Sequence, residues 1–157
     1  MEIKIDFNNS EKIFEDSSIQ LDDASGCVCI KYDENKKTVY TNISYDETDT
    51  EQRQLFTLFH ELGHLKFHIF DNDNLILQLI ETGEPLVINR KGEGLVESQA
   101  NIFSANYLSP VDEIINFINK TDNIDVSSIT KHFNVSPQVI DNQIKNHLNY
   151  IRRKITL

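Results

Sequence analysis

The sequence predicts an α+β fold in which a small antiparallel sheet packs on one long helix and further helices, with a pair of helices at the C-terminal end. Two observations predict it. Segments rich in β-branched and aromatic residues come early in the chain, and apolar residues at helical spacing prevail from residue 51 onward. A chain of 157 residues, of which 39% are hydrophobic, has the size of one ordinary globular domain.

Three strands are expected at residues 3–7, 27–32 and 38–43. The segment Asp-Glu-Asn-Lys between the last two is typical of a hairpin turn. Cys27 and Cys29 are too close in sequence to close a useful disulfide loop, and side chains two apart on a strand share one face. We therefore interpret them as small buried side chains rather than as a metal-binding or redox Cys-x-Cys pair.

A long helix is expected over residues 51–70, because no proline interrupts this segment and its apolar residues recur at helical spacing. These are Leu55, Leu58, Phe59, Leu62, Leu65 and Ile69. Residues 75–80 fit either a helix or a strand, and a short strand is expected at residues 86–89.

A second core helix is expected over residues 95–108, ending at Ser109-Pro110. The same dipeptide opens a third helix, with Ser109 as its N-cap and Pro110 in its first turn. Residues 126–133 and 136–150 then form the C-terminal pair, joined by Asn134-Val135.

The charge of the chain is strongly acidic and unevenly spread. The formal net charge is -10, which argues against a surface that grips nucleic acid. Residues 1–125 hold 24 acidic and 10 basic side chains, whereas residues 126–157 hold 1 acidic and 5 basic ones. The C-terminal helices therefore differ in kind from the body of the chain.

Nothing in the sequence indicates export or insertion into a membrane. The N-terminal residues alternate polar and apolar side chains and lack the apolar run of a signal peptide. The apolar stretches are far shorter than the ~20 residues that span a bilayer. We expect a cytoplasmic protein in a reducing compartment, without membrane contact.

The segment that carries chemistry is the H-E-x-x-H motif His60-Glu61-Leu62-Gly63-His64 inside the long helix. Residues four apart on a helix are neighbours, about 5–6 Å between Cβ atoms, so His60 and His64 can share one zinc ion. Glu61 is then placed to act as general base toward the attacking water. Buried polar residues in an apolar helix would otherwise be costly, which favours the metal site over a chance pattern.

A catalytic zinc of this kind needs a third protein ligand and one open position. Glu97 on the second core helix is our choice, and Asn101, one turn further on, could orient an imidazole. Three other glutamates compete as donors from loop-like sequence: Glu81, Glu84 and Glu93. His68 extends the series of histidines, but it lies about 12 Å along the axis from His60, so it is expected beside the ligands or in the cleft, with replacement of Glu97 as the less favoured alternative.

These motifs resemble those of the ImmA/IrrE family of metallopeptidases. The resemblance rests on residues 53–64, ending in H-E-L-G-H, and on residues 97–110, E-S-Q-A-N-I-F-S-A-N-Y-L-S-P. The family's second motif usually has the form E-x-x-A-N-x-F-A-x-x-L-L-x-P, so Ser104 and Tyr107 depart from it, as does Phe59 where a small residue is common. These departures concern packing more than metal binding.

The resemblance implies a zincin-like, minimal gluzincin fold, with one zinc ion on His60, His64 and Glu97 and with Glu61 as the base. It implies a metallopeptidase core at residues 1–120 and a helix-turn-helix-like segment at residues 121–157 packed on it. Members of the family cut helix-turn-helix transcriptional repressors, including those that silence phages or mobile elements. The expected partner is therefore such a repressor, and the chain would act as an anti-repressor in transcription regulation.

Two other functions stay open at this point. The C-terminal helices could bind DNA, although their turn lacks glycine and most of their basic charge falls at residues 152–154, so no direct nucleic-acid binding is expected. The chain could also bind a repressor without cutting it. The residue that stabilises an oxyanion stays open among Arg90, Tyr107, His68 and His132, and manganese or another ion could replace zinc.

Overall fold

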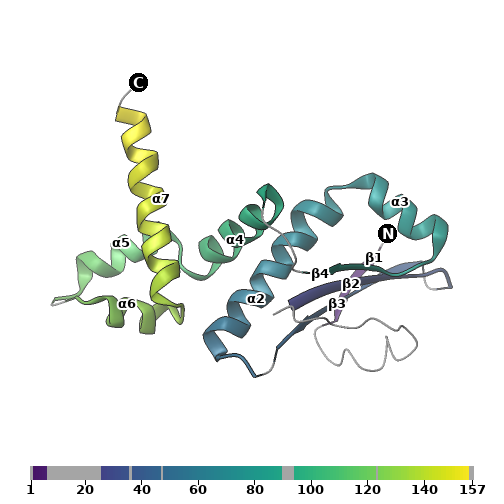
Figure 1. Cartoon of the computed structure of the whole chain (residues 1–157), viewed down its shortest axis with the longest axis horizontal. Helices are drawn as coiled ribbons and strands as arrows, with labels where there is room; N and C mark the ends of the chain where they lie inside the picture. The colour runs from purple at the N-terminus through teal and green to yellow at the C-terminus, as the bar shows by residue number, and fades with distance from the viewer. Residues whose placement is uncertain are drawn as a thin grey trace.

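The computed structural model describes residues 2–6, 26–35, 37–46, 48–89, 94–122 and 124–155. Its α+β fold confirms the predicted class, with a small sheet, helices that cover it and further helices at the C-terminal end (Figure 1). In this described part, no helix is both long and apolar enough to cross a membrane.

The sheet has four strands in the order β1-β3-β2-β4. They are β1 (Glu2–Asp6), β2 (Gly26–Asp33), β3 (Thr38–Tyr45) and β4 (Leu86–Asn89). β2 pairs antiparallel with both β3 and β4, as predicted for a small antiparallel sheet, whereas β1 adds to the far edge of β3 in parallel. Parallel neighbours need a long connection, and β1 and β3 are far enough apart in sequence for one, since the whole of β2 lies between them along the chain.

One face of the sheet carries the first hydrophobic core. Its buried side chains are Val28, Ile30, Val39, Ile43, Leu65, Ile69 and Leu79. They come from β2, β3, η1 (Leu65–Phe70) and α3 (Asp73–Thr82), while α2 (Glu51–His64) adds the partly buried Leu58 and Leu62. Each such side chain contributes about 1.5–3 kcal/mol when fully buried, so this core holds η1 firmly on the sheet, and with it α2, which continues directly into η1.

The predicted long helix is present, but it changes character at its end. Thr50 caps α2 by accepting a hydrogen bond from the Arg53 backbone N–H, and after His64 the chain continues as the π-helix η1. The ambiguous residues 75–80 belong to the helix α3, because Asn72 caps its start and Gly83 ends it in the left-handed region at φ 66°.

The helix α4 (Leu95–Leu108) has the predicted bounds and packs along α2. The two backbones come close at Gly63, where an added Cβ would lie 3.0 Å from the Cα of Ala100 and 3.2 Å from the Cδ1 of Phe103. A larger side chain at this position would push the helices apart, which accounts for a glycine inside a helix.

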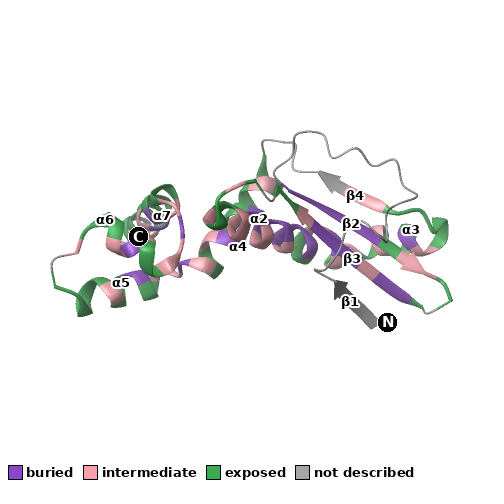
Figure 2. Cartoon of the chain, turned by 90° about the horizontal axis from the view of Figure 1, so that it is seen from below, coloured by how far each residue is buried: buried purple, intermediate pink, exposed green. Residues whose placement is uncertain are grey.

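The C-terminal helices build a second hydrophobic core around Ile114, Ile129, Val135 and Ile140. They are α5 (Val111–Lys120), α6 (Val126–Phe133) and α7 (Pro137–Ile155). These helices lie to one side of the sheet and its helical cover, beyond α4 (Figures 1 and 2). α5 packs with the C-terminal pair, because its Ile114 belongs to this core. The domain boundary at residue 120 stays a prediction.

Two local expectations about these helices need correction. Ser109 is not the N-cap of α5, since Pro110 occupies that position and the Ser109 hydroxyl instead donates to the Ala105 carbonyl, 3.1 Å away, at the end of α4. α7 also runs on to Ile155, past the predicted end at residue 150. Both differences concern helix ends, where local signals are weakest.

Cys27 and Cys29 are free thiols and are 3% and 5% exposed, which confirms that they are small buried side chains. Burial raises the pKa of both thiols, with a further increase at Cys27 from the charge of Glu61, and the pKa of Cys29 rises to about 12. Neither thiol is suited to redox or metal chemistry at neutral pH.

We predict that Gly63→Ala destabilises the protein. The gain in helix propensity is about 1 kcal/mol, but overpacking against a helix backbone costs about 1–3 kcal/mol and Ala100 cannot rotate away. Urea unfolding should therefore show a lower midpoint, whereas Ser98→Ala, at an exposed position of α4, should leave it nearly unchanged. A stabilised Gly63→Ala would contradict the close contact of α2 and α4.

Candidate metal centre

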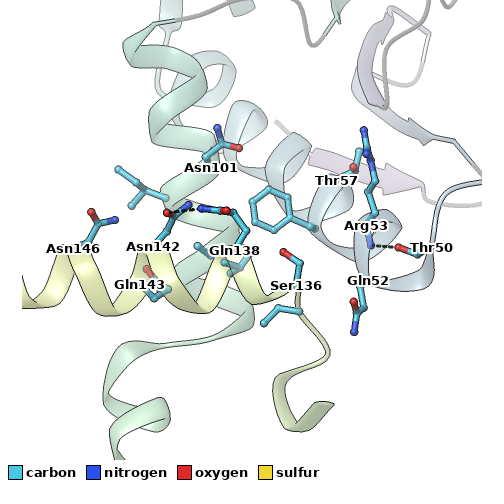
Figure 3. Close-up of a pocket in the computed structure, with 15 residues that line it drawn as sticks. Thr50, Gln52, Arg53, Thr57, Asn101, Ser136, Gln138, Asn142, Gln143 and Asn146 are labelled. Carbon is cyan, nitrogen blue, oxygen red and sulfur yellow. Dashed lines mark hydrogen bonds between the residues drawn. The ribbon is translucent and has the colours of Figure 1, made fainter. Parts of the chain in front are cut away.

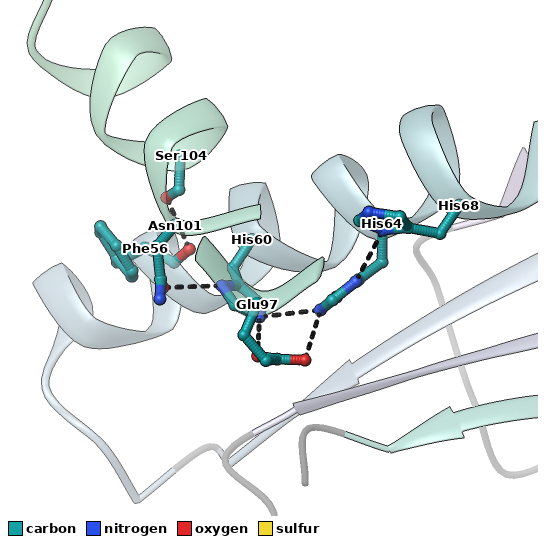
Figure 4. A network of polar contacts seen from close by, with 7 residues as sticks. All are labelled: Phe56, His60, His64, His68, Glu97, Asn101 and Ser104. Carbon is teal, nitrogen blue, oxygen red and sulfur yellow. Dashed lines mark hydrogen bonds and ion pairs between the residues drawn. The ribbon is translucent and has the colours of Figure 1, made fainter. Parts of the chain in front are cut away.

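Two helices bring three metal-binding side chains together. His60 and His64 lie one turn apart on α2, and their Nε2 atoms are 3.0 Å from each other. Glu97 reaches them from α4, with Oε2 3.1 Å from His60 Nε2 and Oε1 3.2 Å from His64 Nε2 (Figure 4). In the described parts of the chain, these three form the one group of at least three His, Cys, Asp or Glu residues whose donor atoms converge, all within 4.8 Å.

The donor set fits a divalent metal ion. Asn101 Oδ1 lies 2.9 Å from His60 Nδ1 and can only accept, so a neutral His60 carries its proton on Nδ1 and a lone pair on Nε2. That lone pair points to the place where His64 Nε2 and the Glu97 carboxylate also converge. Two imidazoles and one carboxylate are the ligands that catalytic zinc sites use in several enzymes.

His64 is held from its other ring nitrogen. His64 Nδ1 lies 3.1 Å from His68 Nδ1 (Figure 4), and His68 Nε2 lies 3.1 Å from Gln99 Oε1. The tautomers then follow in order: His68 donates to Gln99, its Nδ1 accepts from His64, and the Nε2 of His64 is left as a lone pair. Both imidazoles therefore have a partner that sets ring orientation and leaves Nε2 for a metal.

Glu61 lies on α2 beside His60 and is fully buried. Gly26, at the start of β2, makes room for it, since an added Cβ would lie 3.0 Å from Glu61 Oε1 and would collide with the Thr57 methyl group. Sequence reasoning missed Gly26, because nothing local to β2 shows that α2 crosses it there. It also missed Gln99. Side chains on one face of a helix are three or four residues apart, and Gln99 lies only two residues after Glu97, so the spacing did not associate Gln99 with the site.

The other candidates that the structure describes do not reach this centre. Glu81 and Glu84 are exposed at the end of α3 and after it, while Glu93 and Arg90 lie outside the described residues. Tyr107 is 63% exposed and stacks on Phe59, with ring centroids 4.2 Å apart. His132 stacks on Phe117 among the C-terminal helices. Of the three described residues considered for an oxyanion, His68, Tyr107 and His132, only His68 touches the centre.

Comparison with known proteins supports the same chemistry. The family model for M78 peptidases, described as an IrrE N-terminal-like domain, matches residues 30–145. No curated protein matches the chain. The matched segment contains the whole of α2 and α4, and so all three converging donors.

We predict that the purified protein binds about one divalent ion per chain and that His64→Ala and Glu97→Ala both lose it. Elemental mass spectrometry after dialysis measures the content. Glu81→Ala is the matched control, because it removes an exposed glutamate outside the group and should retain the ion. Retention of the ion by Glu97→Ala would show that another residue completes the site.

We also predict that His68→Ala weakens metal binding by about 10–100-fold without abolishing it, because His64 loses the acceptor that orients its ring. Competition with a chelator of known affinity measures the change. Lys66→Ala, an exposed position in the same π-helix, should bind as the unmodified chain does. Equal affinities for the two variants would mean that His68 does not position His64.

Proposed function

The chain belongs to the M78 family of peptidases, and from this premise we propose that it is a zinc-dependent endopeptidase that cuts a helix-turn-helix transcriptional repressor. One observation carries the peptidase proposal: His60, His64 and Glu97 converge with the buried Glu61 beside them. In this proposal the first three hold the metal and Glu61 is the general base.

Zinc is the ion we propose for this site. Three protein ligands of the types His, His and Glu leave one position open, which is the arrangement of catalytic rather than structural zinc. When bound there, the ion would polarise the scissile carbonyl and would lower the pKa of water enough for it to lose a proton and attack at neutral pH. Other divalent ions can use the same donors, so the metal content identifies the ion directly.

The residues of the chain divide the remaining work. Glu61 accepts a proton from the attacking water and passes it to the leaving amine, which needs a carboxylate held beside the open position. Burial between α2 and β2 keeps that carboxylate in one place. Asn101 and His68 hold the two imidazoles so that the donor atoms do not have to reorganise during the reaction.

The repressor substrate rests on analogy with the family and on the charge of the chain. A net charge of -10 suits a protein partner better than direct binding to DNA. Cleavage of the repressor would relieve repression, with the core at residues 1–120 cutting and the segment at residues 121–157 packed on it. The two buried free thiols support action in the reducing cytoplasm.

We predict that Glu61→Gln keeps the metal and the fold but slows cleavage by about 10²–10⁴-fold, because an amide cannot accept the proton. The assay incubates each protein with candidate helix-turn-helix repressors encoded in the same genome and maps products by mass spectrometry. Glu51→Gln, an exposed glutamate in the first turn of the same helix, is the matched control and should cut normally.

The outcomes separate the two remaining functions. Undiminished cutting by Glu61→Gln would exclude Glu61 as the base. A metal-loaded, unmodified chain that binds a repressor and leaves it intact would instead be a non-catalytic regulator.

A further inference from the structure

A groove of about 630 Å³ lies beside the metal centre, between α2, α4 and the start of α7 (Figure 3). Its volume is in the range of about 300–1,000 Å³ that is usual for ligand sites. α7 forms one wall of the groove, and that wall is fixed in place. Gln143 Nε2 donates to Asn106 Oδ1 and to the Ser109 carbonyl of the α4 end, both at 2.9 Å.

Uncharged amide side chains dominate the polar lining of this groove. They are Gln52, Asn101, Gln138, Asn142, Gln143 and Asn146. An amide side chain carries donor and acceptor groups that match the N–H and C=O groups of a peptide backbone, although the Nε2 of Gln143 is already used in binding α4. Gln138 and Asn142 pair with each other at 3.1 Å on the exposed side of α7, and this pair retains donor and acceptor capacity for a ligand.

The remaining lining is mainly apolar. Phe56 of α2, Ile102 and Ala105 of α4 and Val139 of α7 contribute apolar surface. A ligand that fits must therefore combine backbone-like polar groups with at least one apolar side chain.

Charge argues against a phosphate-rich ligand in the groove. Among the described residues that line it, Arg53 is the single charged one, and its Nε lies 3.0 Å from Asp49 Oδ2. Nucleic-acid sites need several basic groups that replace counterions. The chemistry of this groove therefore favours an uncharged peptide.

An extended peptide fits better than a helical one. The backbone groups of a helix are bonded within the helix, so they would leave the amide side chains of the groove without partners. An extended segment presents its N–H and C=O groups outward. The amide-rich lining therefore indicates an extended occupant.

The groove also adjoins the proposed reaction centre. Asn101 lines the groove and contacts His60 Nδ1 at 2.9 Å, and Thr57 lines it one turn before Glu61. A chain lying in the groove thus comes within one side chain of a proposed metal ligand.

We propose that this groove binds an extended, uncharged segment of the protein substrate next to the bond that is cut. The amide side chains of α7 hydrogen-bond its backbone, and Phe56 and Val139 receive an apolar side chain. This inference rests on the peptidase function proposed above. It assigns α7 a direct role in holding substrate.

The test selects ligands without requiring cleavage. Phage-displayed random dodecapeptides are panned on the metal-loaded full chain carrying Glu61→Gln, and selected peptides are synthesised for calorimetry. We expect uncharged sequences with apolar side chains, bound about tenfold more weakly when Asn142→Ala removes an amide or Asn146→Trp fills the groove. Asn149→Trp, on an exposed residue of α7 outside the groove, is the matched control and should bind normally.

Each outcome decides a separate point. The proposal for the groove would be overturned if the selected peptides bound Asn142→Ala and Asn146→Trp as tightly as Asn149→Trp. Selection of charged sequences whose binding falls steeply with salt would also overturn it, and so would a selection with no enrichment. The unmodified chain is then given the same peptides. If the groove variants lose binding but the unmodified chain cuts nothing, the groove stands and the proposed peptidase function fails.

Discussion

The close packing of α4 against α2 is the constraint on which the candidate centre depends. Only where Gly63 removes a side chain can the Cα of Ala100 approach so closely, and this approach sets the height at which α4 presents Glu97. The two histidines share one helix and need no such help. The carboxylate of Glu97 reaches their Nε2 atoms from α4 because the two helix backbones approach closely at Ala100, three residues after Glu97.

Buried polar groups then have to be satisfied around this contact. Asn101 and Ser104, on the same helix as Glu97, contact His60 and the Phe56 carbonyl of α2, at 2.9 and 2.8 Å. Ser104 stands where the related motif usually has alanine, and here its hydroxyl ties the two helices together. The helix pair is thus joined by hydrogen bonds as well as by packing, which raises the cost of any sliding that would separate the three donors.

The C-terminal helices have their own hydrophobic core, yet a buried polar side chain couples them to α4. Gln143 is 5% exposed and donates both to a side chain and to the carbonyl at the end of α4. An amide in this place fixes one orientation, since a shift of α7 would leave a buried carbonyl without its donor. The groove between α2, α4 and α7 has a defined shape for this reason.

The sequence by itself determined the elements and the local part of the site. The bounds of α4 and α6, the antiparallel strands and the pairing of His60 with His64 follow from periodicity, caps and a four-residue spacing, which act within one element. Glu97 could be ranked above its competitors because it lies on a helix. Only the tertiary structure decided four other features. These are the parallel pairing of β1 with β3, the packing of α5 with the C-terminal helices, the space that Gly26 leaves for Glu61, and the contacts that link Gln99, His68 and His64. Each joins residues far apart in sequence or depends on which faces meet, and no local pattern carries that information.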